Sequence, residues 1–472
     1  MPVLRLAVCL LLTLVPLAGR AAEVILHAFN WRYAEVQAQA GAIAARGYTA
    51  VLVSPPARSE GSQWWARYQP QDLRLIDNPL GTTEDVRAMT AALAALGVRS
   101  YADVVLNHMA NEASQRPDLD YPGTRVLSSY ASNPERTARL RLYGDLGLNQ
   151  FGALDFNEAR CINDYNNVQQ VQSWRLCGGG SDPGLPDLRD NPWVVAQQRA
   201  YLQALKDLGF SGFRIDAAKH MSLKHLNAVF SREIRADSFV FGELITGGGV
   251  GQLEYERFLR PYLDGTSHAA YDFPLHVLMR RAFAFGGNLA ELADPLGRGQ
   301  ALPEGRGVTF TVTHDIPNNA GFRGQLMDPV DETLAYAYLY ARRDGVPMVY
   351  SDHNESGDNR WVDAWLRADL SQMIAFRHAV DGSDEQVLAS DSCYLLLRRG
   401  NLGVLGINKC GSAINVSLTL GKTPLWWYTP YQDLLSSHIL EITARTTVFP
   451  LPARSARLWL RAQPATAAAA PR

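Results

Sequence analysis

The sequence feature that limits the fold most is a series of eight short apolar runs with helix-like segments between them. A short apolar run is typical of a buried strand, and apolar residues at every third or fourth position are typical of a helix. Strand and helix alternating eight times indicate an α/β protein built on a closed (β/α)8 barrel, or TIM barrel. The predicted strands are Val24–Phe29, Ala50–Ser54, Ser100–Leu106, Gly212–Ile215, Phe239–Gly242, Ala269–Phe273, Thr309–Thr313 and Met348–Ser351. The clearest helical segments are Glu35–Arg46, Thr83–Leu96, Trp193–Leu208, Leu223–Arg235 and Glu332–Arg343.

The connection after the third predicted strand differs from the others. Residues 109–186 lack one clear helix and are rich in Asn, Asp, Gly, Pro and Tyr. A loop that long in a compact protein is usually functional or forms a small domain. We therefore expect an inserted domain over residues 109–186, with the barrel over residues 23–108 and 187–380.

The pattern changes again beyond the barrel. Residues 381–462 contain short β-like runs without helical spacing, which predicts an all-β C-terminal domain, an antiparallel sandwich. Within it, Tyr394–Leu397 and Gly403–Ile407 flank an Arg-Gly-Asn turn and predict a hairpin. The Ala- and Pro-rich residues 463–472 predict a disordered tail.

The N-terminal segment has the features of a secretory signal peptide over residues 1–22. Arg5 precedes the apolar run Leu6–Ala18, and the small residues Gly19, Ala21 and Ala22 follow. A membrane anchor fits less well, because the run is shorter than the ~20 residues that a spanning helix needs. We expect export, to the periplasm or the medium, after cleavage behind Ala21 or Ala22 and with no membrane anchor left.

Four cysteines remain after removal of the signal, which carries Cys9: Cys161, Cys177, Cys393 and Cys410. An even number in an oxidising compartment predicts two disulfides, for which three pairings exist. We favour the pairing of sequence neighbours. A metal site is the weaker interpretation, because no CxxC spacing occurs.

The charge balance argues against a nucleic-acid or anionic-membrane partner. The formal net charge is −2 and the pI is about 6.6, so no strong field would attract polyanions.

Three of the predicted strands are followed closely by a carboxylic acid. Asp216, Glu243 and Asp315 come directly or almost directly after their apolar runs. In such barrels functional groups gather at the carboxyl ends of the strands. Glycoside cleavage needs a nucleophile, a proton donor and negative charge beside an oxocarbenium-like transition state. The three acids therefore predict a polysaccharide hydrolase.

Each acid has a simpler interpretation when taken alone. Asp216 could form a structural ion pair with Arg214, which shares its face of the strand, although the same arginine would keep a nucleophile ionised. Glu243 could be a rim carboxylate bound to backbone, although partial burial would raise its pKa as a general acid requires. Asp315 follows His314, a pair suited to sugar hydroxyls and to developing positive charge.

Five ordered motifs resemble those of the α-amylase family of glycoside hydrolases, over about residues 24–380. They are Asp103-Val-Val-Leu-Asn107-His108, Leu185-Pro-Asp187-Leu, Gly212-Phe-Arg214-Ile-Asp216-Ala-Ala-Lys219-His220, Phe241-Gly-Glu243 and His314-Asp315. The resemblance implies Asp216 as nucleophile, Glu243 as acid/base and Asp315 as transition-state stabiliser. It also implies a retaining reaction, with the carboxyl groups of Asp216 and Glu243 about 5–5.5 Å apart.

The resemblance also implies ligands. Calcium prefers oxygen donors, and the implied set is Asn107, Asp187, the carbonyl of His220 and that of Gln172. From the residues alone, Asn107 and Asp187 would more often be loop-capping groups. The implied or proposed sugar contacts are Trp64, Trp65, Tyr68, His108, Arg214, Lys219, His220 and His314. Thr313 stands where chloride-activated members have Asn, so chloride activation is not expected. Trp426-Trp427-Tyr428 fits a core strand better than a second starch-binding surface.

We therefore expect a secreted, monomeric, calcium-stabilised, endo-acting enzyme that cleaves internal α-1,4 bonds of starch, glycogen or maltooligosaccharides. The alternatives are a related α-glucan transglycosylase or an exo-acting α-glucosidase. A catalytically inactive carbohydrate-binding protein is the alternative from another class.

Overall fold

The eight predicted strands close a parallel barrel, as expected. The computed structural model describes residues 22–112, 119–420, 425, 428–443 and 446–462. Around the barrel the strands follow the order β1 (Ile25–Ala28), β10 (Val346–Ser351), β9 (Gly307–Thr309), β8 (Ala269–Tyr271), β7 (Phe239–Gly242), β6 (Phe210–Ile215), β5 (Arg99–Val104) and β2 (Ala50–Val53). Strand β2 pairs with β1 and closes the ring.

Helices surround the strands, and the segments predicted from apolar spacing are among them. The helices are α1 (Tyr33–Ala45), α2 (Thr83–Ala94), α6 (Pro192–Asp207), α7 (Leu223–Val229), α8 (Arg232–Arg235), α9 (Arg260–Gly265), α10 (Phe273–Phe283), α12 (Pro329–Ala341) and α13 (Ala368–Ala379). Their starts follow local chemistry. Thr82 and Asp85 form a reciprocal capping box at α2, and the Asn191 side chain caps α6 ahead of Pro192.

Two predicted elements differ from the structure. The single helix expected over Leu223–Arg235 is divided into α7 and α8, because Phe230 leaves the helical region (φ −84°, ψ 64°). The seventh strand ends at Thr309 rather than Thr313, and Asp315 begins the short helix α11 (Asp315–Asn318). Asp315 is therefore carried by the first turn of a short helix beyond the strand and not by the strand itself.

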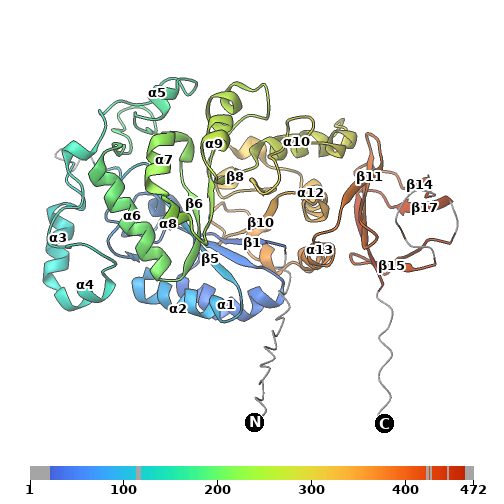
Figure 1. The fold of residues 1–472 in the computed structure, drawn as a ribbon, viewed down its shortest axis with the longest axis horizontal. Helices are drawn as coiled ribbons and strands as arrows, with labels where there is room; N and C mark the ends of the chain where they lie inside the picture. The colour runs from blue at the N-terminus through green and yellow to red at the C-terminus, as the bar shows by residue number, and fades with distance from the viewer. Residues whose placement is uncertain (1–21, 113–118, 421–424, 426–427, 444–445, 463–472) are drawn as a thin grey trace, which may run out of the picture.

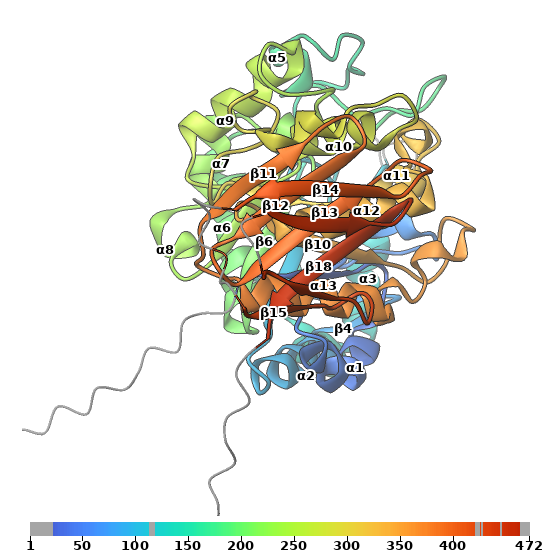
Figure 2. The same cartoon turned by 90° about the vertical axis from the view of Figure 1, so that its right-hand side faces the viewer.

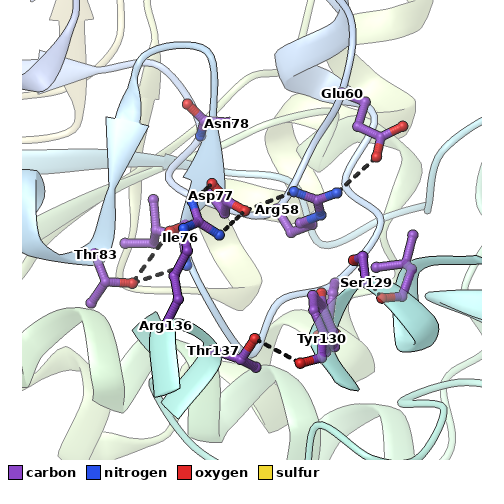
Figure 3. Close-up of polar contacts among 12 residues, drawn as sticks. Arg58, Glu60, Ile76, Asp77, Asn78, Thr83, Ser129, Tyr130, Arg136 and Thr137 are labelled. Atoms are coloured by element: carbon purple, nitrogen blue, oxygen red, sulfur yellow. Dashed lines mark hydrogen bonds and ion pairs between the residues drawn. The ribbon is translucent and has the colours of Figure 1, made fainter. Parts of the chain in front are cut away.

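In Figure 1 the long segment between β5 and α6 lies on one side of the barrel, and the C-terminal sheets lie on the other, beside α12 and α13. This segment carries α3 (Gly123–Ser132), α4 (Pro134–Leu140) and α5 (Val168–Val171). Figure 3 shows how it is tied to the β2–α2 connection: Arg136 of α4 and Arg58 both bind Asp77, and Arg58 also binds Glu60. The β2–α2 connection also carries the 3-10 helix Trp64–Tyr68.

The C-terminal residues form two antiparallel sheets with a common core, which confirms the predicted all-β domain (Figure 2). Leu396 and Trp459 of the larger sheet pack with Val416 and Phe449 of the smaller one. The predicted hairpin is present as β12 and β13, paired from Tyr394–Asn408 to Arg399–Gly403. The larger sheet has the order β11 (Glu385–Ser390), β12 (Tyr394–Arg399), β13 (Gly403–Asn408), β18 (Ser455–Arg461), β15 (Pro430–Asp433) and β16 (Ile439–Glu441), and the smaller pairs β14 (Ile414–Thr419) with β17 (Thr446–Leu451).

Both predicted disulfides are present. Cys161 is bonded to Cys177 inside the long segment, and Cys393 to Cys410 across the β12–β13 hairpin. Residues 1–21 of the predicted signal peptide, Trp426, Trp427 and the tail 463–472 lie outside the described residues. Among the helices that are described, none combines the length and apolar character needed to cross a bilayer.

Candidate active site

The three acids that follow β6, β7 and β9 line one cavity at the carboxyl ends of the strands. Its volume is about 550 Å³. The backbone of neighbouring strands fixes two of the acids: Asp216 N–H donates to the Val104 carbonyl and Glu243 N–H to the Ile215 carbonyl, both at 3.0 Å. The same cavity is lined by Trp64, Trp65, Tyr68, His108, Asp216, Lys219, His220, Glu243, His314 and Asp315, which are ten of the residues singled out from the sequence.

Arg214 is the exception, and its expected contact with substrate is corrected by the structure. Its side chain is fully buried and does not line the cavity. It lies beneath the acids instead. Nη1 binds Asp216 Oδ1 and Asp103 Oδ1, both at 2.8 Å, and Nη2 lies 2.5 Å from Glu243 Oε1. One guanidinium therefore holds three carboxylates, two of them from the predicted catalytic set.

Burial dominates the titration of these acids. Desolvation raises the pKa of Asp216 and of Glu243, and the positive charge of Arg214 lowers both pKa values by less. The expectation that Arg214 alone keeps Asp216 ionised is therefore incomplete, since the net shift of the Asp216 pKa is upward. The charges of Glu243 and Asp315 also raise the pKa of Asp216, and the charge of Asp315 raises that of Glu243. Asp216 and Glu243 therefore retain their protons to a higher pH than isolated carboxyl groups would.

The pKa of Asp315 shifts in the same direction as those of the other two acids. Desolvation raises the pKa of Asp315, and the positive charge of Arg214 lowers it by less. The backbone N–H of Ala217 donates to Oε2 of Glu243 at 3.1 Å.

A tight turn follows Asp216. Ala217 adopts a left-handed conformation, with φ 47° and ψ 34°, which is unfavourable for a residue with a Cβ. Such backbone strain is found most often at functional sites. The turn brings Lys219 and His220 to the cavity wall directly after the acid.

Aromatic rings also line the cavity. The His314 ring is stacked between Phe29 and Tyr68, with ring centroids 4.8 and 5.1 Å away. The Tyr68 hydroxyl donates to Asp103 Oδ2 at 2.9 Å, so the ring is held from below. Trp65 is 47% exposed and presents the largest free aromatic surface of the three residues predicted to contact sugar here.

Sequence reasoning missed two acids of this site. Asp103 is completely buried and binds both Arg214 and Tyr68. A signal for it existed, since Asp103 lies opposite Arg214 in the register of β5 and β6. Glu254 also lines the cavity, where it binds Lys219. It follows no strand, and no sequence signal pointed to it.

A second, smaller cavity brings together the predicted calcium ligands. Asn107, Gln172 and His220 line a space of about 240 Å³ between the long segment and the barrel. Asp187 lies beside it, and Asn157 Nδ2 donates to its Oδ2 at 2.7 Å. Burial raises the Asp187 pKa to about 7, and hydrogen bonds from Asn157 and Asn107 oppose the shift.

This arrangement fits a hard cation better than a transition metal. In the part of the chain that the structure describes, no three His, Cys, Asp or Glu side chains cluster as a metal site. The potential donors are instead one buried carboxylate, amide oxygens and backbone carbonyls. Calcium accepts oxygen donors of these types.

Comparison with known proteins adds independent information. No family model matches the chain. It is 53% identical to an α-amylase of Aeromonas hydrophila over 437 residues, which cover 92% of this chain and 94% of that protein. Its fold is similar to that of a mutant α-amylase I of Eisenia fetida in complex with maltohexaose, with a TM-score of 0.71, 22% identity and 91% and 95% of the two chains covered. The fold is also similar to that of a cyclomaltodextrin glucanotransferase (TM-score 0.70, 18% identity, 93% and 99% covered), so the fold does not separate hydrolysis from transfer.

Proposed function

Since the chain belongs to the α-amylase family of glycoside hydrolases, we propose that it hydrolyses internal α-1,4 bonds of starch or glycogen, with Asp216, Glu243 and Asp315 as its catalytic residues. One observation carries the proposal: a single buried guanidinium binds both Asp216 and Glu243 at the wall of a cavity of about 550 Å³. Cleavage with retention of configuration requires two carboxyl groups close enough to flank one glycosidic bond.

The proposed reaction proceeds in two displacements. Glu243 donates its proton to the glycosidic oxygen while Asp216 Oδ attacks the anomeric carbon, which breaks the glycosidic bond and leaves a glycosyl ester on Asp216. Glu243, now ionised, takes a proton from water, and the hydroxide attacks the same carbon and releases Asp216. Asp315 stabilises the positive charge of both transition states. The separation of about 5–5.5 Å between the two carboxyl groups stays a prediction.

The substrate proposal rests on the shape and chemistry of the cavity. Exposed Trp65 and the ring of Tyr68 offer surfaces for the apolar faces of sugar rings, and His108, His220 and His314 offer ring nitrogens to hydroxyl groups. A neutral polyhydroxylated chain also suits a protein with a net charge of −2.

A reducing-sugar assay tests the proposed function. With soluble starch as substrate, reducing ends should appear from the start while the iodine colour falls early, since endo cleavage shortens chains quickly. A 4-nitrophenyl α-glucoside, offered in parallel, should be cleaved poorly. Rapid release of glucose alone would indicate an exo-acting enzyme, products longer than the supplied maltooligosaccharide would indicate a transglycosylase, and no cleavage at all would indicate a binding protein.

We also propose that calcium binds between the long segment and the barrel. The ion would be held by Asn107, Asp187 and the carbonyl oxygens of Gln172 and His220. It would thereby link the long segment to the barrel. The His220 ring already bridges them, since Nδ1 lies 3.0 Å from the Val171 carbonyl of α5.

Chelation should therefore lower the thermal stability. A cation bound by the folded state alone stabilises it by about 3 kcal/mol when its free concentration is about 100 times Kd. We expect a lower melting temperature by calorimetry in EDTA, and recovery on adding calcium. Asp187→Asn is the matched variant and should melt lower but no longer respond to EDTA. An unchanged melting temperature of the parent protein in EDTA would contradict the site.

The remaining proposals concern organisation and location. Residues 23–108 and 187–380 would form the barrel domain, 109–186 an inserted domain and 381–462 the C-terminal domain. The two disulfides agree with export after cleavage of the signal peptide over residues 1–22. We propose that the exported protein acts as a monomer.

A further inference from the structure

Glu254 is a partly exposed acid that lines the cavity, and the proposed reaction gives it no role. It lies directly before a π-helix, Tyr255–Leu259, and its carboxylate faces the loops that follow β6 and β7. A π-helical turn is rare and occurs frequently at functional sites. Glu254 Oε1 accepts a hydrogen bond from Lys219 Nζ at 2.7 Å, and Oε2 accepts one from Gly247 N–H at 2.9 Å. One carboxylate therefore joins three segments at one side of the cavity.

The Lys219 ammonium is held from several directions. Besides Glu254, its Nζ donates to the Ile245 carbonyl at 3.2 Å and lies 5.0 Å above the centre of the Phe258 ring. The side chain is 9% exposed. An ammonium has three N–H donors. Within the described residues two acceptors are bonded to it, so one N–H is left without an acceptor there. Lys219 also lines the cavity.

Lys219 and Glu254 lie beside the proposed general acid, Glu243. The backbone N–H of Lys219 donates to the backbone carbonyl of Glu243 at 3.1 Å. Ile245, whose carbonyl accepts from the Lys219 ammonium, follows Glu243 by two residues. The general acid must lie beside the glycosidic oxygen, so the sugar that leaves extends past Glu243 on this side. The aromatic rings of Trp65, Tyr68 and His314 come from other loops.

We propose that Glu254 is a positioning residue that directs the remaining N–H of Lys219 to a hydroxyl group of the leaving-group sugar. This inference deepens the proposed function and depends on it. Without the Glu254 carboxylate the long lysine side chain would regain its rotamer freedom, and the charge-assisted bond to substrate would be lost for most of the time. Glu254 would thus determine how strongly the enzyme holds a sugar leaving group.

The test compares two substrates that differ in their leaving groups. Maltoheptaose places sugar residues on the Glu243 side, whereas a 4-nitrophenyl α-maltotrioside cleaved at the aryl bond places there a ring without hydroxyl groups. For Glu254→Gln we expect KM for maltoheptaose to rise about 10-fold with kcat changed less than about twofold, because one charged hydrogen bond is worth about that factor in affinity. KM for the aryl substrate should stay within about twofold of the parent value.

The controls separate positioning from folding. Glu256→Gln changes an acid of the same segment that does not line the cavity and binds Gly251 N–H and Arg260. Its KM and kcat for both substrates should equal those of the parent. Lys219→Met should reproduce the selective rise in KM, and the double variant should add less than about twofold to it. Equal losses on both substrates, or additive effects in the double variant, would overturn the inference alone. A parent enzyme inactive on both substrates would overturn the proposed function together with it.

Discussion

Replacing Glu243 with Gln should leave a folded protein that hydrolyses starch about 10²–10⁴-fold more slowly than the parent. The amide keeps the shape of the side chain but has no proton to give to the glycosidic oxygen, and general acid–base catalysis typically contributes about 10²–10⁴-fold. Because the side chain is buried and accepts the Ala217 N–H, the fold should tolerate the nearly isosteric change. The measurement is kcat on soluble starch, with the far-ultraviolet circular dichroism spectrum and melting temperature as folding checks.

Two companion variants sharpen this result. Asp216→Asn should lose activity to a similar extent, since an amide is a poor nucleophile. Glu256→Gln, outside the cavity lining, should keep the parent rate. Near-parental activity of the Glu243 variant would reject its assignment as the acid, whatever the other variants do.

Replacing Arg214 with Met should lower both stability and activity. The guanidinium is fully buried against Asp103, Asp216 and Glu243, and its removal leaves buried carboxylates without a counter-charge. Breaking a buried ion pair on one side typically costs about 3–5 kcal/mol. We therefore expect a clearly lower melting temperature and a loss of activity at neutral pH of more than about 10-fold.

The pH profile of Arg214→Met tests whether the guanidinium sets the ionisation of Asp216. Arg214 lowers the pKa of Asp216 and of Glu243, so without it both pKa values rise further. An opposite charge at this distance shifts a pKa by about one to three units. Asp216 must be ionised to attack, so the acid limb of the kcat/KM profile should move to higher pH by about that amount. Activity lost at neutral pH should return in part as the pH rises.

A second buried arginine provides the matched control. Arg399 is also buried, but it donates to the carbonyls of Ala341, Val380 and Ser383 where the C-terminal sheet meets the barrel. Arg399→Met should lower the melting temperature without moving the acid limb. If Arg214→Met leaves the acid limb where it is in the parent, the guanidinium does not set the ionisation of the catalytic group.

Much of the architecture could be read from local patterns. Apolar runs and helical spacing depend on residues near one another in the chain, and they predicted all eight strands of the barrel and the β12–β13 hairpin. The even number of cysteines and their spacing predicted both disulfides. Ten of the predicted site residues line one cavity, because strand ends in a parallel barrel meet at one face.

The properties of the site depended on contacts between distant residues. The contacts of buried Arg214 with Asp103 and with Glu243 join residues far apart in sequence. Their pKa shifts arise from desolvation and from several charges acting together, so no single sequence neighbour predicts the net direction. Glu254 binds Lys219, which is 35 positions away in the sequence, and lies in a helix without a motif. The end of β9 at Thr309 depends on its pairing with neighbouring strands. Residue types and their periodicity are local properties, whereas desolvation, ionisation and register are properties of the packed molecule, and only the folded arrangement decides them.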